Sequence, residues 1–200
     1  MRPCTARREW VDIVGLPAIA AVVKEVLGQD SLCISMGGDF VLPGTAQAQY
    51  LHSDFFIWPE AAEESNFVGR PPFFSVNFAV SHINARDGPL RILPGTHRCS
   101  AEACPEESPG AWTAGLAALA PGVAIIRDVR TWHSGTPNLG PRTRYLPSLE
   151  FVPQAYLDHL ERNPEDSRAG PDPKPHADMP RDLYDHLSET SQRFCRHLNC

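Results

Sequence analysis

Hydrophobic and polar positions change their spacing twice along the chain. In residues 9–28, apolar side chains recur every three or four positions and end at Gly28, which predicts an amphipathic helix broken near Pro17. In residues 30–153, the apolar positions gather into short runs rich in β-branched and aromatic residues, with Pro-Gly or Gly-Pro turns between them. These runs are LCISMGGDFVL, AQAQYLHSDFF, PPFFSVNFAVSHIN, GPLRIL, GVAIIRDV and RTRYLPSLEFV. Short strands in this number predict a mainly β fold, an antiparallel sandwich or barrel.

After Pro153 the pattern becomes mixed. Residues 154–162 have helical spacing, and a second short helix is expected near 181–198. Between them, prolines and charged residues leave too little apolar surface for ordered structure. We therefore expect a single domain over 1–200, with a β core at 30–153 and a Pro-rich tail with short helices at 154–200.

Composition narrows the class of protein. With 200 residues, 42% of them hydrophobic and 21% charged, the chain suits one globular domain. The net charge is −6 and no block of like charges occurs, so a nucleic-acid partner is not expected. No apolar run approaches the length of a membrane span.

The compartment is inferred from the first residues and the cysteines. The start, MRPCTARREW, lacks the apolar stretch of a secretory signal, and the six cysteines are then expected to be reduced thiols. Neither His97-x-Cys99 nor Cys195-x-His197 has the spacing of a structural zinc knuckle. These features favour a cytoplasmic, intracellular protein, with organelle targeting left open by the early arginines.

The candidate chemistry lies in two segments of the β core. His52 and Asp54 are two residues apart in a strand-like run, so their side chains are expected on one face. His133 follows the run GVAIIRDV, and two histidines with one carboxylate form the facial triad that binds iron(II) and leaves positions open. Arg144, eleven positions after His133, offers a guanidinium that can hold a carboxylate through two parallel hydrogen bonds.

The order HSD, then GPLRILPGTHR, then RDVRTWHSGTPNLGPRTR resembles the phytanoyl-CoA dioxygenase family over about residues 45–152. The resemblance implies a double-stranded β-helix (a cupin-like jelly roll), in agreement with the strands predicted from the pattern. It implies that His52, Asp54 and His133 hold Fe(II) and that Arg144 binds the 5-carboxylate of the co-substrate 2-oxoglutarate. The family uses O2 and releases succinate and CO2. A carboxylate at Asp54, where related halogenases have a small residue, favours hydroxylation.

The chain also departs from the family pattern. Some members carry a hydroxyl residue two positions after the distal histidine, where this chain has Gly135; the flanking Ser134 and Thr136 are candidates to replace it at the co-substrate. The N-terminal region is short, with one helix where several are common, which fits either a minimal or an incomplete member.

Other residues have weaker support. Tyr50, Phe55, Asn77 and Arg142 are candidates to line a substrate pocket, and the neighbouring aromatic residues suit an apolar small molecule. His97 is expected to serve the architecture of the PGTHR turn, and a second HxD at His176 has no strand or partner around it. The alternatives are a non-catalytic metal-binding jelly-roll module, or an isomerase or epoxidase using the same iron centre.

Overall fold

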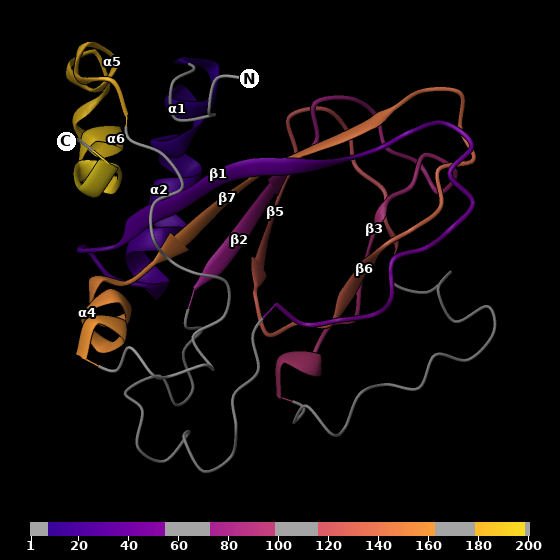
Figure 1. Cartoon of the computed structure of the whole chain (residues 1–200), viewed down its shortest axis with the longest axis horizontal. Coiled ribbons are helices and arrows are strands. Elements are labelled where there is room, and N and C mark those ends of the chain that lie inside the picture. Colours follow the sequence, from indigo (N-terminus) through magenta and orange to yellow (C-terminus); the bar gives the residue numbers. More distant parts are fainter. Residues whose placement is uncertain (1–7, 55–72, 99–115, 163–178, 199–200) are drawn as a thin grey trace.

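Two antiparallel sheets form the centre of the molecule (Figure 1). The computed structural model describes residues 8–54, 73–98, 116–162 and 179–198. The larger sheet has the order β1-β7-β2-β5, and the smaller one the order β4-β3-β6. The strands are β1 Leu32–Val41, β2 Phe74–Phe78, β3 Leu90–Ile92, β4 Leu116–Ala117, β5 Ala124–Asp128, β6 His133–Gly135 and β7 Arg144–Val152. The predicted mainly β, jelly-roll architecture is confirmed.

The strand register gives the larger sheet two unlike faces. Val76 on β2 pairs with Ile126 on β5 and Leu149 on β7, and this apolar face packs against the helices. Ser75 pairs instead with Arg127 and Glu150, and because side chains alternate along a strand these residues lie on the other face. That second face is turned toward the smaller sheet and is polar, so the space between the sheets is where chemistry is expected.

The helices of residues 8–26 and 181–194 pack against the apolar face of the larger sheet (Figure 1), whereas Tyr156 in the helix of residues 154–162 belongs to a separate cluster with Phe73 and Val152. The predicted N-terminal helix is broken where expected, because it ends at Val14 and resumes at Pro17, which suits the first turn of a helix. Gly28 ends it with a φ of 103°, a conformation that favours glycine. The helices are α1 Arg8–Val14, α2 Pro17–Val26, α4 Gln154–Arg162, α5 Arg181–Asp185 and α6 Glu189–Phe194, with the 3-10 turns η2 Thr96–Arg98 and η5 Arg196–Leu198.

The C-terminal helices belong to the core. Met179, Leu187, Phe194 and Leu198 are buried in the same cluster as the residues of α1 and α2, and the ring of Phe194 meets Phe151 of β7 edge-on. The helix predicted at 154–162 is present as α4, the single helix expected near 181–198 is instead divided into α5, α6 and η5, and the proline-rich segment before them lies outside the described residues. None of the described helices is long and apolar enough to cross a lipid bilayer.

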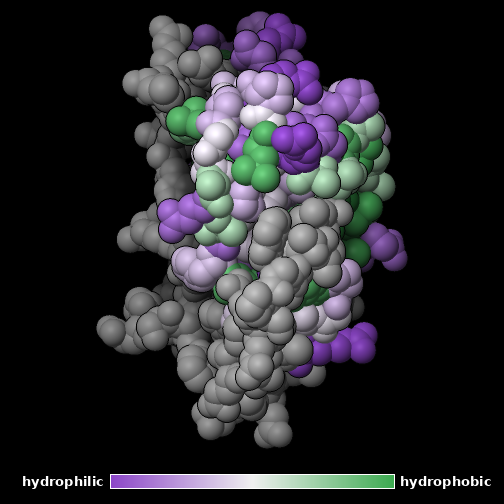
Figure 2. Space-filling model, turned by 90° about the vertical axis from the view of Figure 1, so that its right-hand side faces the viewer, coloured by the Kyte–Doolittle hydropathy of each residue, from purple (hydrophilic) through white to green (hydrophobic). Residues whose placement is uncertain are grey.

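The strand predicted for AQAQYLHSDFF is not formed in the part of this run that the structure describes, residues 46–54. There His52 makes only an isolated bridge, to His133; Thr45, the residue before the run, makes another, to Asn138. Conversely, β6 was not predicted, because three residues of sequence HSG carry no hydrophobic alternation. On the described surface shown in Figure 2, hydrophobic and hydrophilic residues are interspersed, without one continuous apolar patch.

Candidate metal centre

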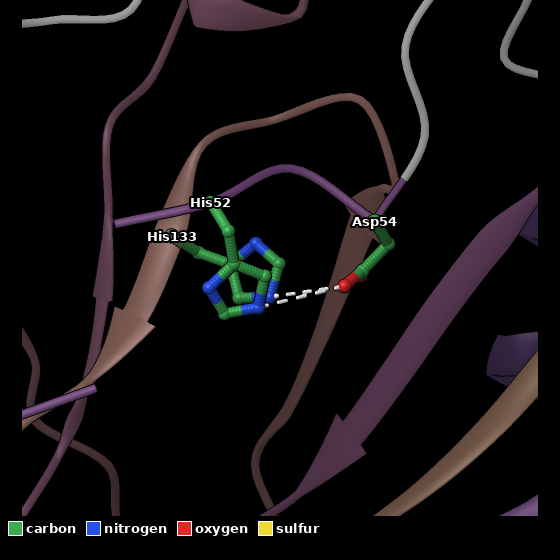
Figure 3. Close-up of side chains that lie close together, drawn as sticks. All are labelled: His52, Asp54 and His133. Atoms are coloured by element: carbon green, nitrogen blue, oxygen red, sulfur yellow. Dashed lines mark ion pairs between the residues drawn. The ribbon is translucent and has the colours of Figure 1, made fainter. Parts of the chain in front are cut away.

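A pair of backbone hydrogen bonds joins the segment of His52 to the segment of His133. The amide of His52 donates to the carbonyl of His133 over 2.9 Å, and the amide of His133 donates back over 2.8 Å. The amide of Asp54 donates to the carbonyl of Val129 over 3.1 Å, which fixes the segment to the loop between β5 and β6 at a second point. The imidazole rings consequently lie 4.3 Å apart, centroid to centroid (Figure 3).

The three predicted metal ligands converge. Oδ1 of Asp54 lies 3.7 Å from Nε2 of His52 and 3.5 Å from Nε2 of His133 (Figure 3). Ligand atoms roughly 2.1 Å from a shared metal and at right angles to one another would be roughly 3.0 Å apart, so small side-chain shifts suffice. Within the described residues, these three form the one group of histidine, cysteine or carboxylate side chains close enough to hold a metal. The donor set suits a divalent transition metal.

A backbone carbonyl lies within hydrogen-bond distance of Nδ1 in each histidine. Nδ1 of His52 lies 2.9 Å from the carbonyl oxygen of Tyr50, and Nδ1 of His133 lies 3.0 Å from that of Thr131. When each Nδ1 carries the proton and donates it, each Nε2 presents a lone pair toward Asp54. This is the arrangement by which outer partners orient metal-binding histidines.

His133 is the more deeply buried of the two imidazoles. Burial, followed by the positive charge of Arg127, lowers the pKa of His133 to about 4. The ring is therefore neutral at neutral pH, which is the form that binds a metal.

The structure also shows a residue that sequence reasoning missed. Arg127, on β5, donates from Nη2 to Oδ2 of Asp54 over 2.8 Å, and its Nη1 lies 3.1 Å from Nδ1 of His133. In the sequence it follows the apolar residues of the run GVAIIRDV, and an arginine at a buried strand position was the available signal.

Arg144 is a buried cation at the start of β7. Its side chain is anchored by Nε, which donates to the carbonyl of Gly88 over 2.9 Å. Among the described residues its Nη1 has no hydrogen-bond partner, although the residue is only 3% exposed. Burial lowers the pKa of Arg144. A buried guanidinium with a free donor is costly unless an anion meets it, so Arg144 fits a carboxylate ligand.

The residues around Gly135 are arranged differently from the prediction. The hydroxyl of Thr136 donates to the carbonyl of Pro89 over 2.6 Å, and Ser134 pairs with Arg91 on the opposite face of β6 from His133. The hydroxyl of Thr136 is therefore engaged by the backbone next to Gly88, the residue whose carbonyl accepts from Arg144, and a role of Ser134 or Thr136 at the co-substrate stays a prediction. A Cβ at Gly135 would lie 3.9 Å from Nη2 of Arg144, so this position faces the guanidinium.

Gln49 partly fills the space beside Gly135. Its Oε1 accepts the backbone N–H of Gly135 over 3.0 Å and would lie 3.3 Å from a Cβ at that position. The amide of Gln49 thus occupies the place where some family members carry a hydroxyl.

The candidate pocket residues are dispersed. Asn77 is buried on β2, on the polar face, and its Oδ1 has no partner among the described residues. Tyr50 is 74% exposed, and the centroid of its ring lies 5.1 Å from that of His52. Arg142 is exposed and precedes β7, so it does not lie on a strand beside Arg144. Phe55 lies outside the described residues.

The PGTHR turn supports the loop that carries His133. The hydroxyl of Thr96 accepts the backbone N–H of Trp132 over 2.9 Å and donates to the carbonyl of Leu93 over 2.6 Å. His97 lies in the adjacent 3-10 turn and is not among the clustered ligands. The expected architectural role of this turn thus has a physical basis, because it fixes the residue next to a metal ligand.

Comparison with known proteins shows the family of the chain. Residues 5–146 match the family described as phytanoyl-CoA dioxygenase (PhyH), and because the match covers more than half of the chain, the protein belongs to this family. Solved structures of non-haem iron proteins share its fold. CytC3 with Fe(II) and alpha-ketoglutarate has a TM-score of 0.52 at 22% identity, over 70% of this chain and 52% of that one.

Two further structures are similar to the same extent. EctD from S. alaskensis, with 2-oxoglutarate and 5-hydroxyectoine, has a TM-score of 0.52 at 24% identity, over 72% of this chain and 52% of that one. SnoN, a non-heme alpha ketoglutarate dependent epimerase from nogalamycin biosynthesis, has a TM-score of 0.52 at 16% identity, over 70% of this chain and 54% of that one. The chain spans about half the length of each of these proteins, and at these identities the likeness shows the fold alone.

Proposed function

We propose that the protein is an Fe(II)- and 2-oxoglutarate-dependent dioxygenase. The observation that carries the proposal is the convergence of Asp54 Oδ1 with Nε2 of His52 and of His133, 3.7 and 3.5 Å away. Two imidazoles and one carboxylate leave open positions on an octahedral iron, as non-haem oxygenases require. Membership of the phytanoyl-CoA dioxygenase family supports the same chemistry.

The residues of the site have separate tasks in this proposal. His52, Asp54 and His133 would hold Fe(II), and Arg144 would bind the distal carboxylate of 2-oxoglutarate through its free Nη1. Bound together with O2, the metal and co-substrate supply the oxidising power, with succinate and CO2 as co-products. Gln49 is placed to contact the same carboxylate from the side of Gly135, whereas Thr136 and Ser134 would support the strand.

We infer that the outcome is hydroxylation of an unactivated carbon of a small molecule. The support is the carboxylate at Asp54, which keeps a protein ligand on the position that related halogenases leave free. The same fold in the epimerase SnoN shows that fold alone does not fix the outcome.

The case for an apolar substrate is weaker than the sequence indicated. Phe73 and Phe74, two of the aromatic residues on which it rested, are buried in separate hydrophobic clusters. Asn77, which lies on the face toward the second sheet, is polar. We therefore propose a substrate with at least one polar group beside an apolar carbon skeleton.

The test is succinate formation from 2-oxoglutarate with Fe(II) and O2, measured for wild type and His52→Ala. Because His52 would supply one of three protein ligands, we expect the variant to lose activity while keeping its fold, checked by circular dichroism. Full activity of His52→Ala would exclude the assignment. Metal binding without binding of 2-oxoglutarate would instead support the non-catalytic module.

A further inference from the structure

Arg127 contacts two of the three candidate metal ligands from one side. It lies on β5, its side chain is 6% exposed, and it belongs to the polar face of the larger sheet. Its Nη2 donates to Oδ2 of Asp54 over 2.8 Å, and its Nη1 lies 3.1 Å from Nδ1 of His133. Both of these partners are themselves parts of the metal centre.

The two oxygens of Asp54 therefore have different surroundings. Oδ1 is the atom that faces the two imidazole nitrogens, and Oδ2 is held by the guanidinium. A carboxylate free to rotate could offer both oxygens to a cation, whereas an oxygen engaged in a charge-assisted hydrogen bond is withdrawn from it. The geometry makes Oδ1 the oxygen available to a metal.

Nδ1 of His133 has two competing neighbours. It cannot donate a proton to the carbonyl of Thr131, 3.0 Å away, and at the same time accept one from Arg127. Accepting from Arg127 places the imidazole proton on Nε2, where it blocks a metal; donating to Thr131 frees Nε2. In the metal-binding tautomer, Arg127 is thus left with Asp54 as its hydrogen-bond partner.

Arg127 is buried at a position of β5 where an apolar side chain would also fit. Ile125, two residues earlier on the same face of β5, shows that an apolar side chain fits the strand. Arg127 also leaves its Nε without a partner among the described residues, which adds to the cost of burying the charge. By contrast, Arg130 in the following turn bonds the carboxylate of Asp128 and is independent of the candidate ligands.

We propose that Arg127 is a positioning residue that restrains Asp54 to bind the metal through Oδ1 alone. This inference rests on the proposed function, since it assumes that His52, Asp54 and His133 hold a metal. Electrostatics by itself predicts the opposite effect, because removing a positive charge beside a cation site should tighten binding of the cation. The sign of the change in affinity therefore separates orientation of the carboxylate from a pure charge effect.

The experiment measures Mn(II) affinity by electron paramagnetic resonance for wild type, Arg127→Met, Arg127→Lys and Arg130→Met. Loss of a partner that orients a metal ligand typically weakens binding by roughly 10- to 100-fold, which we expect for Arg127→Met. Arg127→Lys keeps the charge and one donor without the rigid fork, so an intermediate loss of roughly threefold to tenfold is expected. Arg130→Met removes a neighbouring arginine and should leave the affinity unchanged. The Mn(II) spectrum of Arg127→Met should also change shape as Asp54 gains rotational freedom.

Each outcome bears on one of the two proposals. A wild-type protein that binds no Mn(II) would overturn the proposed function. Wild-type binding with equal or tighter affinity in Arg127→Met would overturn the positioning role. If Arg127→Met fails to fold, Arg127→Lys decides: weakened affinity at an unchanged melting temperature supports the role, and unchanged affinity overturns it.

Discussion

Burial of the Arg144 guanidinium should lower the stability of the free protein, and its contact with bound 2-oxoglutarate should raise the stability of the complex. The side chain is 3% exposed, one bond from Nε to the carbonyl of Gly88 anchors it, and Nη1 has no partner among the described residues. Replacement by methionine removes a buried charge that lacks a full set of partners. We therefore expect Arg144→Met to leave the melting temperature of the free protein unchanged or to raise it.

The same substitution should abolish the response to the co-substrate. Hydrogen bonds to a charged group contribute about 1.5–3 kcal/mol each, so losing a two-bond contact costs about 3–6 kcal/mol, or at least about a hundredfold in the dissociation constant. At a concentration of about 100 times the dissociation constant, 2-oxoglutarate should stabilise the wild type by about 2.7 kcal/mol. For a chain of this length that raises the melting temperature by roughly 5–11 °C.

The assay is thermal denaturation with and without 2-oxoglutarate, in the presence of Mn(II) and absence of turnover. Wild type should show the shift and Arg144→Met should not. Arg142→Met is the matched control, because Arg142 is exposed and precedes the strand. An equal shift in wild type and Arg144→Met, or a strongly destabilised free variant, would refute the reasoning about Nη1.

Two further predictions concern stability. Both ring nitrogens of His197 are buried and have no hydrogen-bond partner within the described part of the chain, and burial lowers the pKa of His197 from 6.5 to about 4. Above pH 6.5, titration of His197 does not lower the free energy of unfolding. As the pH decreases from 6.5 toward 4, the free energy of unfolding falls by up to about 3 kcal/mol, because only the unfolded chain then takes up the proton. His197→Phe should flatten this part of the pH profile, measured by urea denaturation; an unchanged profile would contradict it. A Cβ on Gly38 would lie 2.7 Å from Cα of Pro147, whereas one on Gly37 meets nothing within 4 Å. Gly38→Ala should therefore lower the free energy of unfolding by about 1–3 kcal/mol and Gly37→Ala should not, and equal effects in the two variants would exclude the strand-contact explanation.

Elements that depend on the spacing of a few neighbouring residues were predictable from the sequence. The break at Pro17, the end of the helix at Gly28 and five of the six strand-like runs depend on spacing within a few residues, and the structure has them. The three ligands and Arg144 were found because the order and spacing of the motifs resemble a family. Their roles as ligands and anchor stay predictions, as do the division of the chain into core and tail and the intracellular location.

Features that depend on tertiary contacts were not predictable. The segment around His52 has strand-like composition, but its hydrogen bonds go to an isolated bridge with β6, and β6 is too short for any periodicity. Arg127 reaches Asp54 because the backbone of Asp54 is hydrogen-bonded to Val129, the residue that follows β5. Thr136 has the right chemistry for the co-substrate, and its hydroxyl bond to the carbonyl of Pro89, 47 positions away in the sequence, is a tertiary contact.

The most direct test of the central claim is an anaerobic titration with Fe(II) and 2-oxoglutarate, followed by the visible charge-transfer band of the iron–2-oxoglutarate chelate. If His52, Asp54 and His133 hold the iron and Arg144 holds the co-substrate, the band appears in wild type. It is then absent in His133→Ala, and in Arg144→Met it requires far more 2-oxoglutarate. A band of unchanged intensity in His133→Ala, or a wild-type protein that binds iron and never gives the band, would contradict the account.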